Sequence, residues 1–196
     1  MRYSAEHKQQ IREKVLAAAA RTIREQGPDR VSVAAVMGEV GLTHGGFYAH
    51  FASKEALVAA SIEHMFQQMS ARIDEVSDGK DGREALHDYI DFYLSERHAQ
   101  ARDRGCPIAA LGSDLPRLDD TARKAFAEGM AIQHRRLRDF FKSLGVANPD
   151  DAAHSLRSEL LGALLSARLV KAGERKAVLE ASRQSLKRRF GLQPSA

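Results

Sequence analysis

The chain has 196 residues, and its 43% hydrophobic and 29% charged residues are typical of a folded globular protein rather than a disordered or fibrous one. Its single cysteine cannot form an intramolecular disulfide, which favours a reducing compartment, and we expect the cytoplasm. The N-terminus does not read as a signal peptide, and the longest apolar stretch near the C-terminus, residues 160–170, is too short to cross a membrane. The net charge of +4 fits contact with a polyanion.

Hydrophobic residues recur with a period of 3.6 along the whole chain and predict an all-α fold of about nine helices. The first helix is predicted over residues 5–26 and is stopped by Gly27 and Pro28. A short helix capped by Ser32 runs to about residue 40, and another capped by Thr43 runs to about residue 49. Gly41 separates these two short helices.

A long helix capped by Ser53 is predicted to reach about residue 76, where a turn-rich segment, residues 77–82, interrupts it. The next helix carries apolar residues from 86 to 94. Cys106 and Pro107 open a short helix that Pro116 ends. Three more helices are expected over residues 119–144, from 149 to a stop at Gly173, and over 174–189, before a tail over residues 191–196.

The segment from residue 31 to residue 57 is the most informative part of the sequence. Gly41 permits a sharp turn between the two short helices, which predicts a helix-turn-helix whose second helix is a recognition helix. The N-terminus of a helix presents free N–H groups and a positive dipole to phosphate. The small core that would fix the crossing of the two helices consists of Val33, Val36, Val40, Leu42, Phe47 and Phe51.

The same segment resembles the tetracycline-repressor-like (TetR/AcrR) family of transcriptional regulators. Within about residues 10–60, the family pattern is met by Gly41, Leu42, Thr43, Phe47, Tyr48, His50, Phe51, Lys54, Glu55 and Leu57. The resemblance implies a homodimeric repressor that binds a palindromic operator in double-stranded DNA and is released by a small, hydrophobic effector. It also implies a helix-turn-helix domain over residues 1–52 and a helical effector-binding and dimerisation domain over residues 53–196.

The resemblance assigns DNA-contacting roles to individual residues. Thr43 and His44 would face bases or nearby phosphates, and Tyr48, His50 and Lys54 would bind phosphates. We add Ser32 through its cap position, and Gly45 and Gly46 because they let the backbone approach DNA closely. The recognition helix carries no Arg or Lys for a bidentate guanine contact, yet residues 1–54 hold eight Lys and Arg against five Asp and Glu. The alternative is that Tyr48 is ordinary packing and Lys54 a solvated charge.

The resemblance also assigns roles to the remaining helices. The last two would pair with their copies in a second chain, with a monomeric core as the alternative. The middle helices would enclose the effector pocket, although for each pocket candidate taken singly plain core is the favoured interpretation. These candidates are Met65, Phe66, Met69, Tyr89, Phe92, Tyr93, Cys106, Phe126 and Met130.

Cys106 carries a second hypothesis, in which the regulator senses oxidants or electrophiles through this thiol. Its place at a predicted helix N-terminus near Arg102 and Arg104 would favour the thiolate, and the alternative is a small buried hydrophobic residue. An enzyme is disfavoured, because the eight histidines form no metal-ligand pattern and no nucleophile elbow or nucleotide-binding loop is present. We therefore expect neither a cofactor nor a metal ion.

Overall fold

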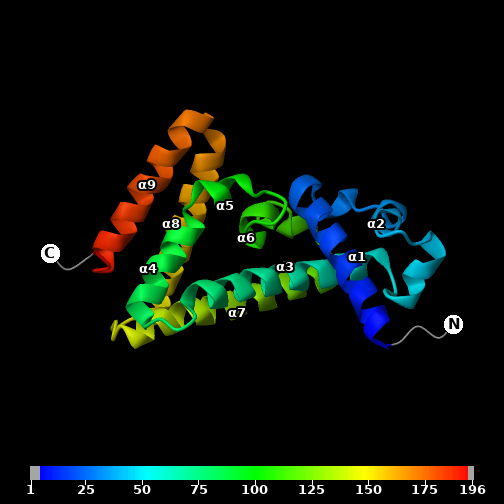
Figure 1. The fold of residues 1–196 in the computed structure, drawn as a ribbon, viewed down its shortest axis with the longest axis horizontal. Coiled ribbons are helices and arrows are strands. Elements are labelled where there is room, and N and C mark those ends of the chain that lie inside the picture. Colours follow the sequence, from blue (N-terminus) through cyan, green and yellow to red (C-terminus); the bar gives the residue numbers. More distant parts are fainter. Residues whose placement is uncertain (1–4, 194–196) are drawn as a thin grey trace. The chain divides into compact units, whose positions relative to one another are not determined.

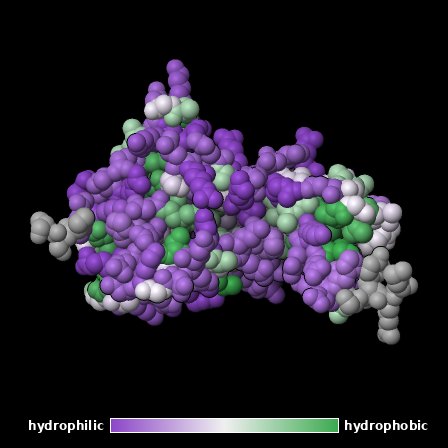
Figure 2. Space-filling view, in the orientation of Figure 1, coloured by the Kyte–Doolittle hydropathy of each residue, from purple (hydrophilic) through white to green (hydrophobic). Residues whose placement is uncertain are grey.

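The computed structural model describes residues 5–193, and within that range it contains helices, turns and loops but no strand, which confirms the all-α prediction (Figure 1). Residues 1–4 and 194–196, the latter part of the predicted tail, lie outside the described residues. No helix within residues 5–193 is both long and apolar enough to span a bilayer. The face in Figure 2 is largely hydrophilic, with hydrophobic residues in small separate patches.

The chain divides into two compact units. The first comprises residues 5–68 and 106–129, and the second comprises residues 69–105 and 130–193. The predicted domain boundary after residue 52 falls inside the first unit, which also includes the N-terminal part of the long helix. The helices are α1 (Ala5–Gln26), α2 (Val33–Glu39), α3 (Lys54–Ser77), α4 (Gly82–Tyr93), α5 (Glu96–Gln100), α6 (Pro107–Leu111), α7 (Asp120–Ser143), α8 (Pro149–Leu169) and α9 (Ala172–Arg189), with 3₁₀ turns η1 (Pro28–Arg30), η2 (His44–Ala49) and η3 (Leu115–Arg117).

In the first unit, α1 packs on α2, η1 and α6. The predicted apolar face of α1 is confirmed at Val15, Ala19 and Ile23, which are fully buried, whereas Ile11 and Leu16 are half-buried. Ser53 accepts a hydrogen bond from Ala56 N at 3.1 Å and caps α3 as predicted.

In the second unit, α8 and α9 pack side by side, and α4 and α5 pack against both of them. The α8–α9 hairpin is tied internally by Arg175 Nε, which donates to Ala167 O at 3.1 Å. Asp81 caps α4 by accepting from Arg83 N and Glu84 N at 2.8 and 2.9 Å. Figure 1 shows the two long helices of the hairpin running next to each other at the C-terminal end of the chain.

Three local predictions were wrong. The predicted stop at Gly173 fails because α8 ends at Leu169 and α9 already begins at Ala172; Gly173 is not among the glycines with positive φ. The short helix opened by Pro107 ends at Leu111 rather than at Pro116, which instead lies in the separate turn η3. Helix α5 was missed, and Ser95 starts it by accepting from His98 N at 3.1 Å.

Candidate nucleic-acid interface

The helix cap and the turn of the helix-turn-helix form at the residues that the sequence predicts. Ser32 caps α2 by accepting from Ala35 N at 3.4 Å. Gly41 has a φ of 75°, a left-handed conformation that glycine adopts without steric cost, and it reverses the chain after α2. The N–H of Leu42 then donates to Met37 O at 2.9 Å and closes the turn.

The recognition helix is a 3₁₀ helix over His44–Ala49 rather than an α-helix. Two consecutive glycines, Gly45 and Gly46, lower its helix propensity, and a six-residue segment closes too few i to i−4 hydrogen bonds to offset them. Thr43 occupies the cap position, but its side chain makes no capping hydrogen bond. Its hydroxyl is exposed with the rest of the residue and is free to face another molecule.

A small core holds this helix in place. Phe47 and Phe51 are buried, and their rings stack with centroids 5.7 Å apart. Val36 is buried as predicted, and Met37, which the sequence pattern did not single out, is fully buried beside it in α2. The other predicted members are half-buried and lie toward the edge of this core: Val33, Val40 and Leu42.

The residues expected to face DNA are mostly exposed. Ser32, Thr43, His44 and Gly45 are exposed, and Gly46 is half-buried. Tyr48 exposes 66% of its surface, which is uncommon for a large aromatic side chain and argues against ordinary packing. Its ring and the Phe47 ring meet edge to face at a centroid distance of 5.3 Å, so the buried core supports one side of the exposed tyrosine.

Lys54 and His50 are half-buried. Lys54 Nζ donates to Asp29 O at 3.0 Å, which holds the ammonium near the N-terminus of α3. The Nδ1 atom of His50 is buried without a hydrogen-bond partner. Burial, followed by the positive charges of Lys8 and Arg12, lowers the pKa of His50 below its usual value, so the imidazole is neutral near pH 7 and can take up a proton beside a phosphate.

Arg12 is the residue that sequence reasoning missed. Its Nη1 donates to the carbonyl of His50 at 2.6 Å, and its guanidinium lies over the Phe51 ring at 4.3 Å from the centroid. It therefore fastens the C-terminal end of the recognition helix to α1. A second link joins α1 to α2 through the ion pair of Arg21 with Glu39. The only sequence signal for Arg12 was its contribution to the basic excess of residues 1–54.

The predicted pocket residues are distributed over both units. In the first unit, Met65, Phe66, Cys106 and Phe126 are buried, and the Phe66 and Phe126 rings meet edge to face at 5.3 Å. In the second unit Met69, Tyr89 and Tyr93 are buried, while Phe92 and Met130 are half-buried. Burial suits both core and pocket lining, so their effector role stays a prediction.

Cys106 is 1% exposed and precedes the five-residue helix α6. A thiol this deeply buried has little access to solvent, which is the setting of a small core residue. A sensing role would require the site to open first, and it remains a hypothesis.

Buried His98 was missed as a feature of the second unit. Its Nδ1 lies 2.7 Å from Tyr93 O, so this nitrogen carries the proton and donates it to the carbonyl. Its ring stacks on Phe92 and meets Tyr93 edge-on, at centroid distances of 5.2 and 4.7 Å. Burial lowers the pKa of His98. The sequence offered no signal for this, since a lone histidine on a helix is compatible with any exposure.

Comparison with known proteins agrees with this geometry. The family model described as bacterial regulatory proteins, tetR family, matches residues 15–61, from within α1 to within α3. An HTH-type transcriptional regulator of Mycobacterium tuberculosis strain H37Rv is 29% identical over 167 residues, which cover 81% of this chain and 84% of that protein. An HTH-type transcriptional regulator of Lactococcus lactis is 27% identical over 185 residues, covering 91% of this chain and 92% of that protein.

Solved structures share the whole fold. The reduced form of E. coli NemR matches with a TM-score of 0.79 at 22% identity, over 91% of this chain and 97% of that one. A TetR transcriptional regulator from Chloroflexus aurantiacus matches with a TM-score of 0.80 at 23% identity, over 96% of this chain and 98% of that one. At such identities the likeness establishes the fold, and the family model identifies residues 15–61 as the helix-turn-helix segment of the tetR family of bacterial regulatory proteins.

Proposed function

We propose that the protein is a homodimeric, sequence-specific DNA-binding repressor that binds a palindromic operator and is released by a small hydrophobic effector. The main observation behind the DNA-binding role is that the recognition helix combines buried aromatic residues, which hold it in place, with exposed residues that can contact DNA. Phe47 and Phe51 anchor the helix, while Thr43, His44 and Tyr48 are exposed. The match to the tetR-family model and the names of the HTH-type relatives support the same role.

The geometry suggests how DNA would be held. The N-terminal end of the recognition helix, with Thr43, His44 and two glycines, would enter the major groove, where backbone N–H groups can approach closely. Phosphates would be bound by Tyr48, His50 and Lys54, and by Ser32 at the start of α2. Since the recognition helix has no Arg or Lys, sequence would be read by Thr43 and His44 and by the shape of the DNA.

Dimerisation through α8 and α9 is supported by exposed leucines. Leu165 and Leu169 expose 40% and 87% of their surfaces and lie one helical turn apart on α8. Leu160 and Leu164 of the same helix are buried within the chain, so α8 has apolar side chains on both faces. A second copy related by a two-fold axis would cover the exposed leucines and place two recognition helices on the two halves of a palindrome.

Release by an effector requires only that the ligand favours the released conformation by a few kcal/mol. The candidate residues for this role are the apolar and aromatic side chains of the middle helices named above. The protein would then act by binding and not by catalysis, and it would act in the cytoplasm, where bacterial DNA is located.

The DNA-binding role is tested by selecting bound sequences from a random duplex pool at about 150 mM salt with competitor DNA. We expect a palindrome to emerge. On that operator, Lys54→Ala should lower the slope of log affinity against log salt by about 1.8, which corresponds to one phosphate lost in each half-site. Lys124→Ala, which removes a 76% exposed cation of α7, is the matched control and should leave the slope unchanged. Unselective binding by the purified protein, with and without candidate effectors, would contradict the proposal.

The assembly is tested separately by light scattering. Leu169→Asp places a charge on the proposed interface and should give a monomer, whereas Lys124→Asp, an exposed change on α7, should leave the dimer intact. A dimer that survives both Leu165→Asp and Leu169→Asp would place the interface elsewhere.

A further inference from the structure

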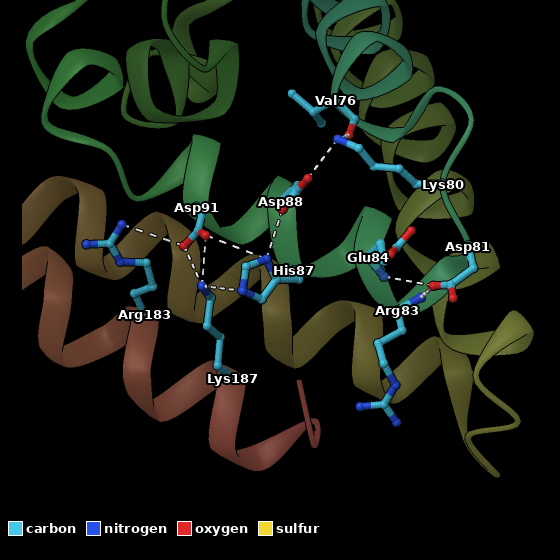
Figure 3. A network of polar contacts seen from close by, with 10 residues as sticks. All are labelled: Val76, Lys80, Asp81, Arg83, Glu84, His87, Asp88, Asp91, Arg183 and Lys187. Carbon is cyan, nitrogen blue, oxygen red and sulfur yellow. Dashed lines mark hydrogen bonds and ion pairs between the residues drawn. The ribbon is translucent and has the colours of Figure 1, made fainter. Parts of the chain in front are cut away.

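The polar side chains between α4 and α9 are paired with one another, which explains their positions without a ligand. Lys187 Nζ lies 2.8 Å from His87 Nε2 and 2.7 Å from Asp91 Oδ1, and Lys80 binds Asp88 Oδ2 at 2.7 Å (Figure 3). These contacts hold α9 against α4. Another polar side chain of the second unit, on α5, is buried more deeply and is paired at only one of its two nitrogens.

This side chain is His98, which is 5% exposed. Its Nδ1 donates to Tyr93 O at 2.7 Å, because a carbonyl can only accept, and Nε2 of the neutral ring is therefore an acceptor. Nε2 is buried without a hydrogen-bond partner among residues 5–193. Gln133 Oε1, in α7 of the same unit, is a second buried acceptor without a partner. Unpaired buried polar atoms are rare in folded proteins, and here both call for a donor.

Two aromatic rings fix the orientation of the His98 imidazole. Phe92 stacks on it at a centroid distance of 5.2 Å and an interplanar angle of 25°, and Tyr93 meets it edge to face at 4.7 Å. Since the two ring nitrogens of an imidazole point in different directions, Nε2 is directed away from the Tyr93 carbonyl. Phe92 is half-buried, so the aromatic cluster extends from the core to a side chain that is accessible to solvent.

The surroundings of Nε2 combine acceptors with a donor. A Cβ at residue 105 would lie 3.6 Å from His98 Nε2, 3.1 Å from Arg168 Nη2 and 2.6 Å from Ala101 O, but Gly105 has no side chain. Arg168 is held in place because its Nε donates to Ala99 O at 3.1 Å. A ligand group that approaches Gly105 therefore meets two acceptors and one cationic donor. A hydroxyl group suits such surroundings, because it can donate and accept at the same time.

We propose that His98 Nε2 is the polar recognition point for the effector, and that the effector is an aromatic molecule that carries a hydroxyl group. The hydroxyl donates to Nε2 and accepts from Arg168, and the aromatic body packs beside Phe92. Burial lowers the pKa of His98, the hydrogen bond to Tyr93 O raises it by less, and the charge of Arg168 lowers it further, so the ring is neutral near pH 7 and able to accept. The inference rests on the proposed function only in calling this molecule the effector, because the hydrogen bond itself requires no DNA.

Pairs of small aromatic compounds test this hydrogen bond in the full-length protein without DNA. We choose β-naphthol and para-ethylphenol, each with its methyl ether, because the ether keeps the oxygen and the apolar body but cannot donate. Calorimetry should show saturable binding of the hydroxyl compounds, with each ether weaker by about tenfold or more, the scale expected for one hydrogen bond to a buried acceptor. Equal affinity within both pairs, or no saturable binding of either hydroxyl compound, would overturn the proposal.

The decisive variant is His98→Asn. The amide nitrogen of asparagine can replace Nδ1 as the donor to Tyr93 O, whereas no atom replaces Nε2 as the acceptor. We expect the variant to lose the preference for hydroxyl over ether by about tenfold, while His154→Asn, an exposed change on α8, keeps it. A preference that survives in a folded His98→Asn protein would show that the hydroxyl binds elsewhere and would contradict the proposal.

Nitrogen NMR of the wild type labelled in histidine gives a second readout that does not depend on how well the variant folds. The Nε2 resonance of His98 should shift when β-naphthol is added and should stay in place when its methyl ether is added. A resonance that does not respond to bound β-naphthol would overturn the assignment of Nε2. Because these measurements use no operator, failure to select a palindrome would contradict the DNA-binding proposal and leave their outcome unchanged.

Discussion

Replacing Gly129 with alanine should destabilise the protein, although alanine favours helices. A methyl group at this position of α7 would overlap the Phe66 ring, with ring atom Cε2 only 2.8 Å away. Phe66 is 4% exposed and packs edge to face on Phe126, so the ring has little room to move. Because the methyl group would overlap the ring itself, we expect an overpacking cost in the upper part of the usual range, about 2–3 kcal/mol, and the gain in helix propensity returns about 1 kcal/mol. We expect Tm to fall by about 2–8 °C, from about 2–4 °C per kcal/mol for a chain of this size.

Thermal unfolding followed by circular dichroism measures this effect. The control is Gly38→Ala in α2, where a methyl group meets nothing within 4 Å and should raise Tm slightly. Both variants are melted over a tenfold range of concentration, so that any change in association is visible. Adding Phe66→Leu to Gly129→Ala should recover part of the loss. An unchanged Tm for Gly129→Ala would show that Phe66 moves freely, as the wall of an adaptable effector pocket would.

The burial of His98, His50 and Cys106 leads to three further predictions. Burial lowers the pKa of His98, so the unfolded chain binds more protons than the folded protein below about pH 6.5, and the free energy of unfolding falls as the pH falls. Denaturant unfolding at pH 7.5 and at pH 5.5 should show a smaller loss of this free energy in His98→Asn than in the wild type. Burial also lowers the pKa of His50 in the free protein, so a phosphate beside the ring should draw a proton onto it; operator affinity should therefore rise from pH 8 to pH 6, and His50→Gln should reduce this rise. Cys106 should react with a thiol reagent much more slowly in the native protein than in denaturant, and equal rates would contradict its burial.

Local features were predictable because they depend on neighbouring residues. A serine placed before a helix and a glycine after one act through atoms at most a few positions away, as Ser32, Ser53 and Gly41 do. The exposure of the recognition helix followed from the family motif. The 3₁₀ geometry over His44–Ala49 was not predicted, although the pair of glycines was its signal.

Long-range polar contacts could not be predicted in this way. Arg12 and His50 are 38 positions apart, and Lys187 and His87 are 100 positions apart. From the sequence alone, any of the 30 Lys and Arg residues could be the partner of the His50 carbonyl or of the His87 ring, because these side chains are long and flexible. Only the folded arrangement of α1 beside the helix-turn-helix and of α9 beside α4 selects the partners.

Helix α1 is joined to three neighbouring helices by arginine side chains. Along one helix, Arg12 holds the end of the recognition helix, Arg21 pairs with α2, and Arg24 donates to Gln68 of α3 at 3.0 Å. Helix α3 begins at Lys54, just after the recognition helix, and continues from the first unit into the second. A helix is stiff along its axis because its backbone hydrogen bonds repeat at every residue. We therefore expect a displacement of α3 to move Lys54 directly and α1 through Arg24, so that the lysine proposed to bind phosphate and the support of the recognition helix would shift together.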